Sequence, residues 1–217
     1  MYIDDIEKGK NIIVVGAGST VREYQDKIES FIHNREAVTI GINKITDFIV
    51  PKYHIWTNRQ RWGAFGSCIS RKSELLFGSS IKKQAIHKYY KGKVNRLSYT
   101  DRDGLKVDYK NGKICGHFRT AGCLAVMVAH VMGAKNIFIV GMDGFTLHRE
   151  KDVKSGKASH HCYGKGYTDD AGWEACVLKD KLVDQALHNM SDYGVSFKII
   201  TPTKFVDFYD PDLLGIR

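Results

Sequence analysis

The segment Asn11-Ile-Ile-Val-Val-Gly-Ala-Gly-Ser-Thr20 decides the fold. Its first half is an apolar run, and a strand that is apolar on both sides is typical of a parallel sheet covered on both faces. The run ends in a glycine turn. After the turn, apolar residues recur at helical spacing from Val21 to Ile32, and Ser19 or Thr20 can supply an N-cap. This order of strand, turn and helix is the opening unit of an α/β domain.

The same alternation continues along the chain. Further apolar runs predict strands, and longer apolar patterns predict two helices at residues 119–133 and 173–190; the strands are expected at residues 37–40, 54–56, 74–77, 136–140 and 196–200. This alternation predicts a Rossmann-like fold, an open and mostly parallel sheet with helices on both faces. Asp103-Gly104 and Asn111-Gly112 predict a small hairpin excursion at about residues 96–116, and a polar, glycine-rich stretch predicts a lid-like loop at about residues 146–168.

Length and composition fit one globular domain over residues 1–217. Hydrophobic residues make up 43% and charged residues 26%, which excludes disordered, collagen-like and coiled-coil classes. The longest apolar stretch, residues 121–132, contains His130 and is too short to cross a bilayer. The first residues are charged, unlike a secretory signal, and the five cysteines form no C-x-x-C pair. We therefore expect a cytoplasmic protein, with peripheral contact at the inner face of the membrane as an option.

The formal charge of +9 is unevenly distributed. Residues 81–113 carry ten Lys and Arg against three Asp, a net charge of +7 within one stretch. Such a stretch attracts nucleic acid, acidic lipid headgroups or a phosphorylated substrate. The alternative interpretation is a solvated face that keeps the protein soluble.

Polar side chains follow the predicted strands at the points where they end. Ligands of open α/β sheets bind beyond the carboxyl ends of the strands. We therefore expect one crevice to collect these side chains, which are Ser19, Asn43, Asn58, Ser79, Ser80 and Asp143.

The glycine turn after the first strand has two explanations. Gly16-Ala17-Gly18 resembles the start of a dinucleotide-binding turn, in which absent Cβ atoms let backbone amides approach a phosphate. The alternative is close packing alone. Val21 replaces the third glycine, and no acidic residue follows the second strand, which disfavours a nicotinamide dehydrogenase. The sequence also lacks a G-x-x-x-x-G-K-[ST] phosphate loop.

Two further groups of residues suggest chemistry. Asp101-x-Asp103 has the spacing of a metal-binding carboxylate pair, although aspartate is also common in turns. In the long loop, His160 and His161 are candidates for proton transfer, and Tyr163 and Tyr167 are candidates for hydrogen bonds to a leaving phosphate. Ordinary surface histidines remain the alternative.

Several segments together resemble a known family. They appear in the order Val15-Gly-Ala-Gly-Ser-Thr20, Gly41-Ile-Asn43, Ile55-Trp-Thr-Asn58, Glu74-Leu-Leu-Phe-Gly-Ser-Ser80, Arg119-Thr-Ala-Gly122, Gly133-Ala-Lys-Asn-Ile-Phe-Ile-Val-Gly-Met-Asp143 and Ser159-His160. This series resembles the bacterial sialyltransferases of glycosyltransferase family 42 and the related unknown-function family-115 domains, which are Rossmann-like. The resemblance implies a metal-independent, inverting transfer of an acidic sugar (sialic acid, Kdo or a related sugar) from a CMP-activated donor to a glycan or lipid-linked acceptor.

The resemblance also implies roles for individual residues. The donor would be the substrate, with no cofactor and no metal, and a loop histidine, His160 or His161, would be the general base. Tyrosines, here Tyr163 and Tyr167, would stabilise the leaving phosphate. The donor-binding set would be Gly16, Gly18, Ser19, Asn43, Asn58, Ser79, Arg119, Thr120, Ala121, Gly122, Gly141 and Asp143.

The chain departs from this family pattern in three places. The family turn Gly-Asn-Gly-Pro-Ser is Gly16-Ala-Gly-Ser-Thr20 here, Tyr163-Gly-Lys165 stands where the base histidine is expected, and Phe145 replaces a tyrosine.

Two other functions stay open. A pterin diphosphokinase-like enzyme would use Mg²⁺ and ATP, with Asp143 and Asp101 or Asp103 as metal ligands. A non-catalytic module would bind nucleotides or RNA through residues 82–93, with Tyr89 and Tyr90 as stacking platforms. The basic stretch at residues 82–113 would contact a membrane or an anionic acceptor. Homo-oligomers and a place within a longer polypeptide are both compatible with the sequence.

Overall fold

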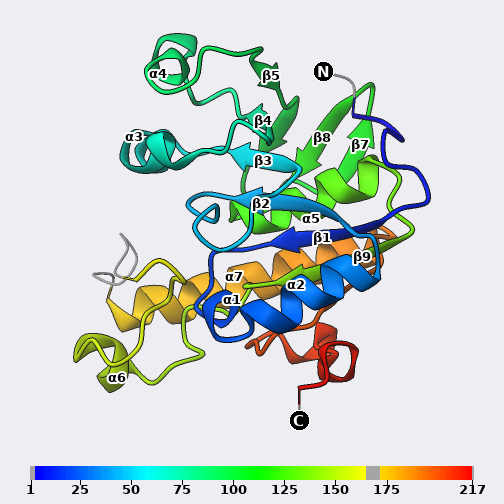
Figure 1. Cartoon of the computed structure of the whole chain (residues 1–217). Helices are drawn as coiled ribbons and strands as arrows, with labels where there is room; N and C mark the ends of the chain where they lie inside the picture. The colour runs from blue at the N-terminus through cyan, green and yellow to red at the C-terminus, as the bar shows by residue number, and fades with distance from the viewer. Residues whose placement is uncertain (1–2, 165–171, 217) are drawn as a thin grey trace.

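The predicted Rossmann-like α/β fold is confirmed by the strand order. The computed structural model describes residues 3–164 and 172–216. All pairings in its seven-stranded sheet are parallel, and the order is β10 (Phe197–Ile199), β9 (Asn136–Val140), β1 (Asn11–Val15), β2 (Val38–Ile42), β3 (Tyr53–Trp56), β4 (Glu74–Phe77) and β5 (Asn95–Arg96). Because β1 pairs with β2 on one side and with β9 on the other, the strand order reverses at β1 (Figure 1). Ligands of such sheets bind at this point.

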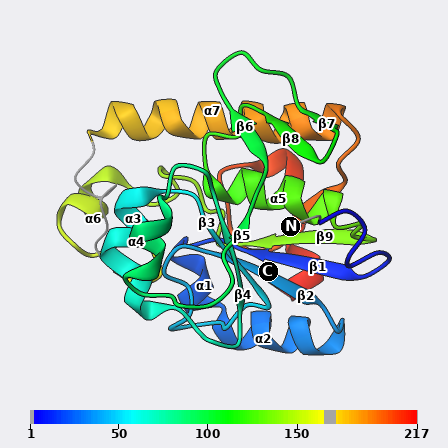
Figure 2. The ribbon, with the colours of Figure 1, turned by 90° about the horizontal axis from the view of Figure 1, so that it is seen from above.

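Helices cover both faces of the sheet, as expected. The long helices α5 (Ala121–Val131) and α7 (Trp173–Asp192) lie on one face, and α1 (Thr20–Glu23) and α2 (Gln25–Asn34) lie on the other (Figure 2). Strand β1 divides its side chains accordingly, with Ile12 and Val14 in the core under α5 and Ile13 and Val15 in the core under α2. Nine of the eleven residues of α5 are buried, which explains why apolar residues occur on every side of this helix.

A third apolar cluster, which the sequence pattern did not predict, joins short helices to strands β3 and β4. The helices are α3 (Arg59–Phe65), which contributes Trp62, and α4 (Lys83–His87), which contributes Ile86. The 3₁₀ turn η1 (Gly66–Cys68) follows α3. The indole of Trp62 packs edge-on against Trp56 and Phe77, with ring centroids 5.1 and 5.0 Å away. Its Nε1 donates to Ala85 O at 2.7 Å, which holds α3 beside α4.

The excursion differs in part from the predicted set of hairpins. Its strands β6 (Tyr99–Asp101), β7 (Asp108–Lys110) and β8 (Lys113–Gly116) form a separate sheet in the order β6-β8-β7. Only β7 and β8 make a hairpin, through Asn111 and Gly112, whose φ values are +53° and +72°. Strand β6 pairs with β8 in parallel, so Asp103-Gly104 begins a longer connection.

The segment expected to be a long lid contains structure of its own. It includes the short helix α6 (Glu150–Lys154), and Cys162 is buried and donates its backbone N–H to Ala17 O at 2.9 Å. The part of the segment around Cys162 therefore packs on the glycine turn. The 3₁₀ turns η2 (Val206–Phe208) and η3 (Pro211–Leu214) close the chain, and no helix in the described ranges is long and apolar enough to span a membrane.

Candidate functional site

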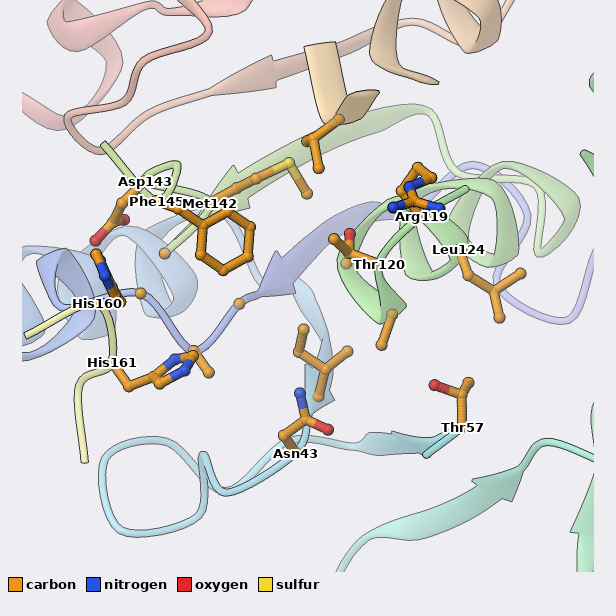
Figure 3. Close-up of a pocket in the computed structure, with 18 of the residues that line it drawn as sticks. Asn43, Thr57, Arg119, Thr120, Leu124, Met142, Asp143, Phe145, His160 and His161 are labelled. Atoms are coloured by element: carbon orange, nitrogen blue, oxygen red, sulfur yellow. The ribbon is translucent and has the colours of Figure 1, made fainter. Parts of the chain in front are cut away.

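A cavity of about 300 Å³ opens at the carboxyl ends of β1, β2 and β9, where the strand order reverses. Its walls are the turns after these strands, the first residues of α5 and the histidine pair of the loop. Figure 3 shows His160 and His161 on one side, with Arg119 and Thr120 opposite and Phe145 between them. The lining also includes Thr57, Arg61, Tyr99, Asp101, Met142, Val183 and Phe205.

Most of the side chains expected at one crevice do meet there. Twelve of the expected site residues line the cavity: Gly16, Gly18, Asn43, Asn58, Arg119, Thr120, Ala121, Gly122, Gly141, Asp143, His160 and His161. Ser19 lies beside the cavity, bonded to Asp143. Ser79 and Ser80, both expected in the crevice, are exposed and do not line the cavity, because β4 lies three strands from β1. Tyr163 contacts two lining residues, and Tyr167 lies outside the described residues.

The two glycines of the turn leave no space for a Cβ atom. A Cβ on Gly16 would lie 2.2 Å from Gly141 O, and one on Gly18 would lie 2.4 Å from the Asp143 carboxyl. The Gly16 and Gly18 amides donate to Val140 O and Gly141 O, so they already have backbone partners. This geometry supports the explanation by close packing.

Asp143 occupies the N-terminal end of α1. Its carboxylate accepts bonds from Thr20 N at 2.9 Å, Thr20 Oγ1 at 2.5 Å and Ser19 Oγ at 3.2 Å. The Ser19 hydroxyl also lies 2.8 Å from His148 Nε2, and because it donates to Asp143, the imidazole donates to it. Burial raises the pKa of Asp143 to about 6, against the lowering effect of the Thr20 and Ser19 bonds and of nearby His148. A negative charge therefore already stands where this helix end would bind a phosphate.

His54 lies under the floor of the cavity. Its side chain is fully buried, and its Nε2 lies 2.6 Å from Asn43 O, to which it donates. Burial lowers the pKa of His54 to about 4, although the bond to Asn43 opposes this effect. Asn43 has a φ of +53°, so the bond from His54 helps to fix an unusual backbone conformation at the cavity wall.

Asp143 and His54 predict opposite pH dependences of stability. The folded pKa of Asp143 lies above its unfolded value near 4, so its contribution to stability grows as the pH falls from about 7 to 4. The folded pKa of His54 lies below its unfolded value near 6.5, so its contribution to stability decreases as the pH falls over the same range. Each effect is worth up to about 3 kcal/mol, and the two largely cancel.

We therefore expect the free energy of unfolding of Asp143→Asn to fall more steeply than that of the unaltered protein as the pH is lowered from 7 to 5. His54→Gln should show the reverse, because an amide keeps the donor to Asn43 O without titrating. Urea unfolding at both pH values measures the difference. Parallel pH profiles for all three proteins would contradict these assignments.

The side of the cavity formed by α5 is suited to an anion. Arg119 has a φ of +62°, in a three-residue turn closed by a bond from Thr120 N to Phe118 O at 2.6 Å. Such a conformation costs free energy and is concentrated at binding sites. Thr120 then caps the helix by accepting from Cys123 N, and the amide ends of α5 face the cavity at Ala121 and Gly122.

The opposite side of the cavity carries the two imidazoles. His161 is half-buried and stacks on the Tyr163 ring, with centroids 4.8 Å apart and planes at 11°. The Tyr163 hydroxyl accepts from Arg61 Nη1 at 3.0 Å. His160 is 6% exposed and packs edge-on against Phe145. These contacts fix both rings at the cavity wall.

Several lining residues were not predicted from the sequence. Arg61 had no motif around it, and Tyr99 comes from the separate β6-β8-β7 sheet. His148, which does not line the cavity but contacts Ser19 beside it, had no motif around it either. Asn58, which was expected to contact the ligand, also caps α3, where its Oδ1 accepts from Gln60 N and Arg61 N. The sequence offered a signal for this cap, since an asparagine directly before a helix is a common N-cap.

The residues considered as metal ligands have other partners. Asp101 Oδ1 accepts from Phe118 N at 2.9 Å, and Asp103, whose side chain is 92% exposed, pairs with His117. Within residues 3–164 and 172–216, no three His, Cys, Asp or Glu side chains are grouped so that they could hold a metal ion. The expectation that no metal is needed stays a prediction from the resemblance.

Comparisons with known proteins add little to this geometry. No protein-family model matches the chain, and no curated protein matches it. Among solved structures, it is similar to the prephenate dehydrogenase from A. aeolicus, crystallised with hydroxyphenyl propionate and NAD+. The similarity covers 85% of this chain and 87% of that chain at 10% identity, with a TM-score of 0.23. The fold class therefore stands on the strand order.

Proposed function

We propose that the protein is an inverting glycosyltransferase that transfers an acidic sugar from a CMP-activated donor to a glycan or lipid-linked acceptor. The observation that carries the proposal is the meeting of Asn43, Asn58, Arg119 and the histidine pair in one cavity at the point where the strand order reverses. Amides that donate and accept suit a pyrimidine or sugar, and the guanidinium suits an anion.

In the proposed complex, the donor phosphate lies at the Arg119 side. The amide end of α5 and the Arg119 guanidinium both favour negative charge there, whereas the end of α1 already holds the Asp143 carboxylate. As the bond from the anomeric carbon to the phosphate oxygen breaks, charge accumulates on CMP. These same groups would stabilise it.

The proposed base is His161, one of the two histidines predicted from the sequence. It lines the wall opposite Arg119, and its ring is held by Tyr163, which Arg61 in turn orients. The acceptor hydroxyl would attack the anomeric carbon from this side and pass its proton to the imidazole. Attack opposite the leaving phosphate inverts the anomeric centre.

A panel of nucleotides in a thermal unfolding assay tests the donor class. We expect CMP to raise the melting temperature, with stabilisation of about 2.7 kcal/mol at a hundredfold excess over Kd. Arg119→Ala should lose most of this effect, whereas Lys110→Ala, on the exposed β7, should keep it. UDP, ATP and NAD should stabilise less than CMP.

The same panel can overturn the proposal. A response to ATP only with Mg²⁺ would favour the pterin diphosphokinase-like alternative, and a response to none of the nucleotides would remove the CMP-donor assignment.

A further inference from the structure

The net charge of the molecule comes from one segment. Residues 51–98 hold eleven Lys and Arg and one acidic residue, Glu74, a net charge of +10. Since the whole chain carries +9, the remaining residues together carry −1. The structure also divides the basic stretch seen in the sequence. The separate sheet, residues 99–116, has four Lys and Arg against three Asp, so six of the seven net positive charges of residues 81–113 lie before it, at α4, at β5 and at the residues beside them.

The cationic side chains of this segment lie on elements that touch one another. Helices α3 and α4 are joined by the bond from Trp62 Nε1 to Ala85 O and by one from the Tyr89 hydroxyl to Gly63 O at 3.0 Å. Figure 1 shows α3 and α4 side by side at the β4 end of the sheet. We call the exposed cations of α3, of α4 and of the residues directly before and after α4 the basic face; its members are Arg59, Lys82, Lys83, Lys88, Lys91 and Lys93.

The basic face has no counter-charge within the described part of the chain. No carboxylate there forms an ion pair with any of its six members. Six neighbouring cations that have no ion-paired carboxylate in residues 3–164 and 172–216 repel one another, and binding a polyanion relieves this repulsion while it releases counterions.

The basic face leads to the cavity. Arg61 belongs to α3, lines the cavity and donates to Tyr163 on the His161 side. A chain bound along α4 and α3 would therefore have its end beside the proposed base. We infer that the basic face binds an extended anionic glycan, whose terminal sugar enters the cavity as the acceptor. This inference rests on the proposed function.

Two other polyanions fit the surface less well. None of the exposed large apolar side chains in the described residues lies on α3 or α4, so this face has no group to insert into a bilayer. The rings of Tyr89 and Tyr90 are half-buried and pack in the third apolar cluster against Trp62 and Phe77, which leaves less of each ring free to stack on a nucleic-acid base.

Charge reversal tests the inference. The variant Lys82→Glu/Lys83→Glu/Lys88→Glu should weaken binding of a sialic acid oligomer at least about tenfold at low salt. The matched control Lys106→Glu/Lys110→Glu/Lys113→Glu, which places the same charge change in the second sheet, should change binding less than about threefold. Neutral dextran oligomers should not bind. Circular dichroism and the unfolding midpoint show whether each variant folds.

Three outcomes would overturn the inference. These are equal losses in the two triple variants, tighter binding to phosphatidylserine vesicles than to the oligomer, and tighter binding to a single-stranded oligonucleotide. Measuring the stabilisation by CMP in the same variants distinguishes a failure of this inference from a failure of the proposed function. We expect the basic-face variant to keep its response to CMP, and a protein that binds the oligomer but not CMP would contradict the proposed donor alone.

Discussion

The variant Gly16→Ala should be destabilised by about 3–5 kcal/mol, one of the largest effects available to a single methyl group. The added Cβ would lie 2.2 Å from Gly141 O and 2.7 Å from Gly141 C, which are backbone atoms at the end of the neighbouring strand β9. Backbone cannot rotate away as a side chain can. To relieve this clash, β1 and β9 would have to separate at their carboxyl ends, where the turns that follow them line the cavity.

The matched control is Gly63→Ala. Gly63 lies inside α3, and no atom is within 4 Å of its added Cβ. Alanine should stabilise that helix by about 0.5–1 kcal/mol. Urea unfolding measures both variants. A Gly16→Ala protein as stable as the unaltered chain would show that β1 and β9 are not in such close contact.

Under the proposed reaction, His161→Gln should lower turnover by ~10²–10⁴ with little change in folding. Glutamine keeps much of the volume that packs on Tyr163, but it has no group that accepts a proton at neutral pH. Turnover is measured as CMP release from a CMP-linked acidic sugar in the presence of an acceptor.

Two comparisons separate a base from a structural side chain. Added imidazole should restore part of the turnover of His161→Gln, because a soluble base can replace a missing proton acceptor but not a missing packing contact. His33→Gln, an exposed position on α2, should retain full turnover. Loss of turnover in His160→Gln instead, with His161→Gln unaffected, would move the assignment to His160.

The sequence predicted the sheet well because its strands are short apolar runs that end in glycine or polar residues. Glu74–Phe77 and Asn136–Val140 were predicted to the residue. Helix α3 was missed, since its seven residues contain Gly63 and bury only Trp62, too little for a helical pattern. The role of Asn58 as its cap was missed with it.

The site was predicted in position more than in detail. The strand ends predicted where the cavity lies, and Asn43, Asn58 and Asp143 do line it. Ser79 and Ser80 do not, because the sequence did not give the distance of β4 from the strand at which the order reverses. The bonds of Asp143 to Thr20, 123 residues earlier in the chain, depend on how β9 pairs with β1. Local patterns cannot supply that pairing.

The uneven distribution of charge gives the molecule a permanent electric dipole. With +10 on residues 51–98 and −1 on the rest, its positive pole lies at the edge formed by α3 and α4. Near a sulfonate bead or another fixed array of anions, the electric field should orient the protein before contact, so that it binds the array through that edge. Charge changes at α4 should then alter the retention on a cation-exchange column far more than equal changes at β7. Comparing the retention of the two kinds of variant therefore measures the orientation in which the protein binds.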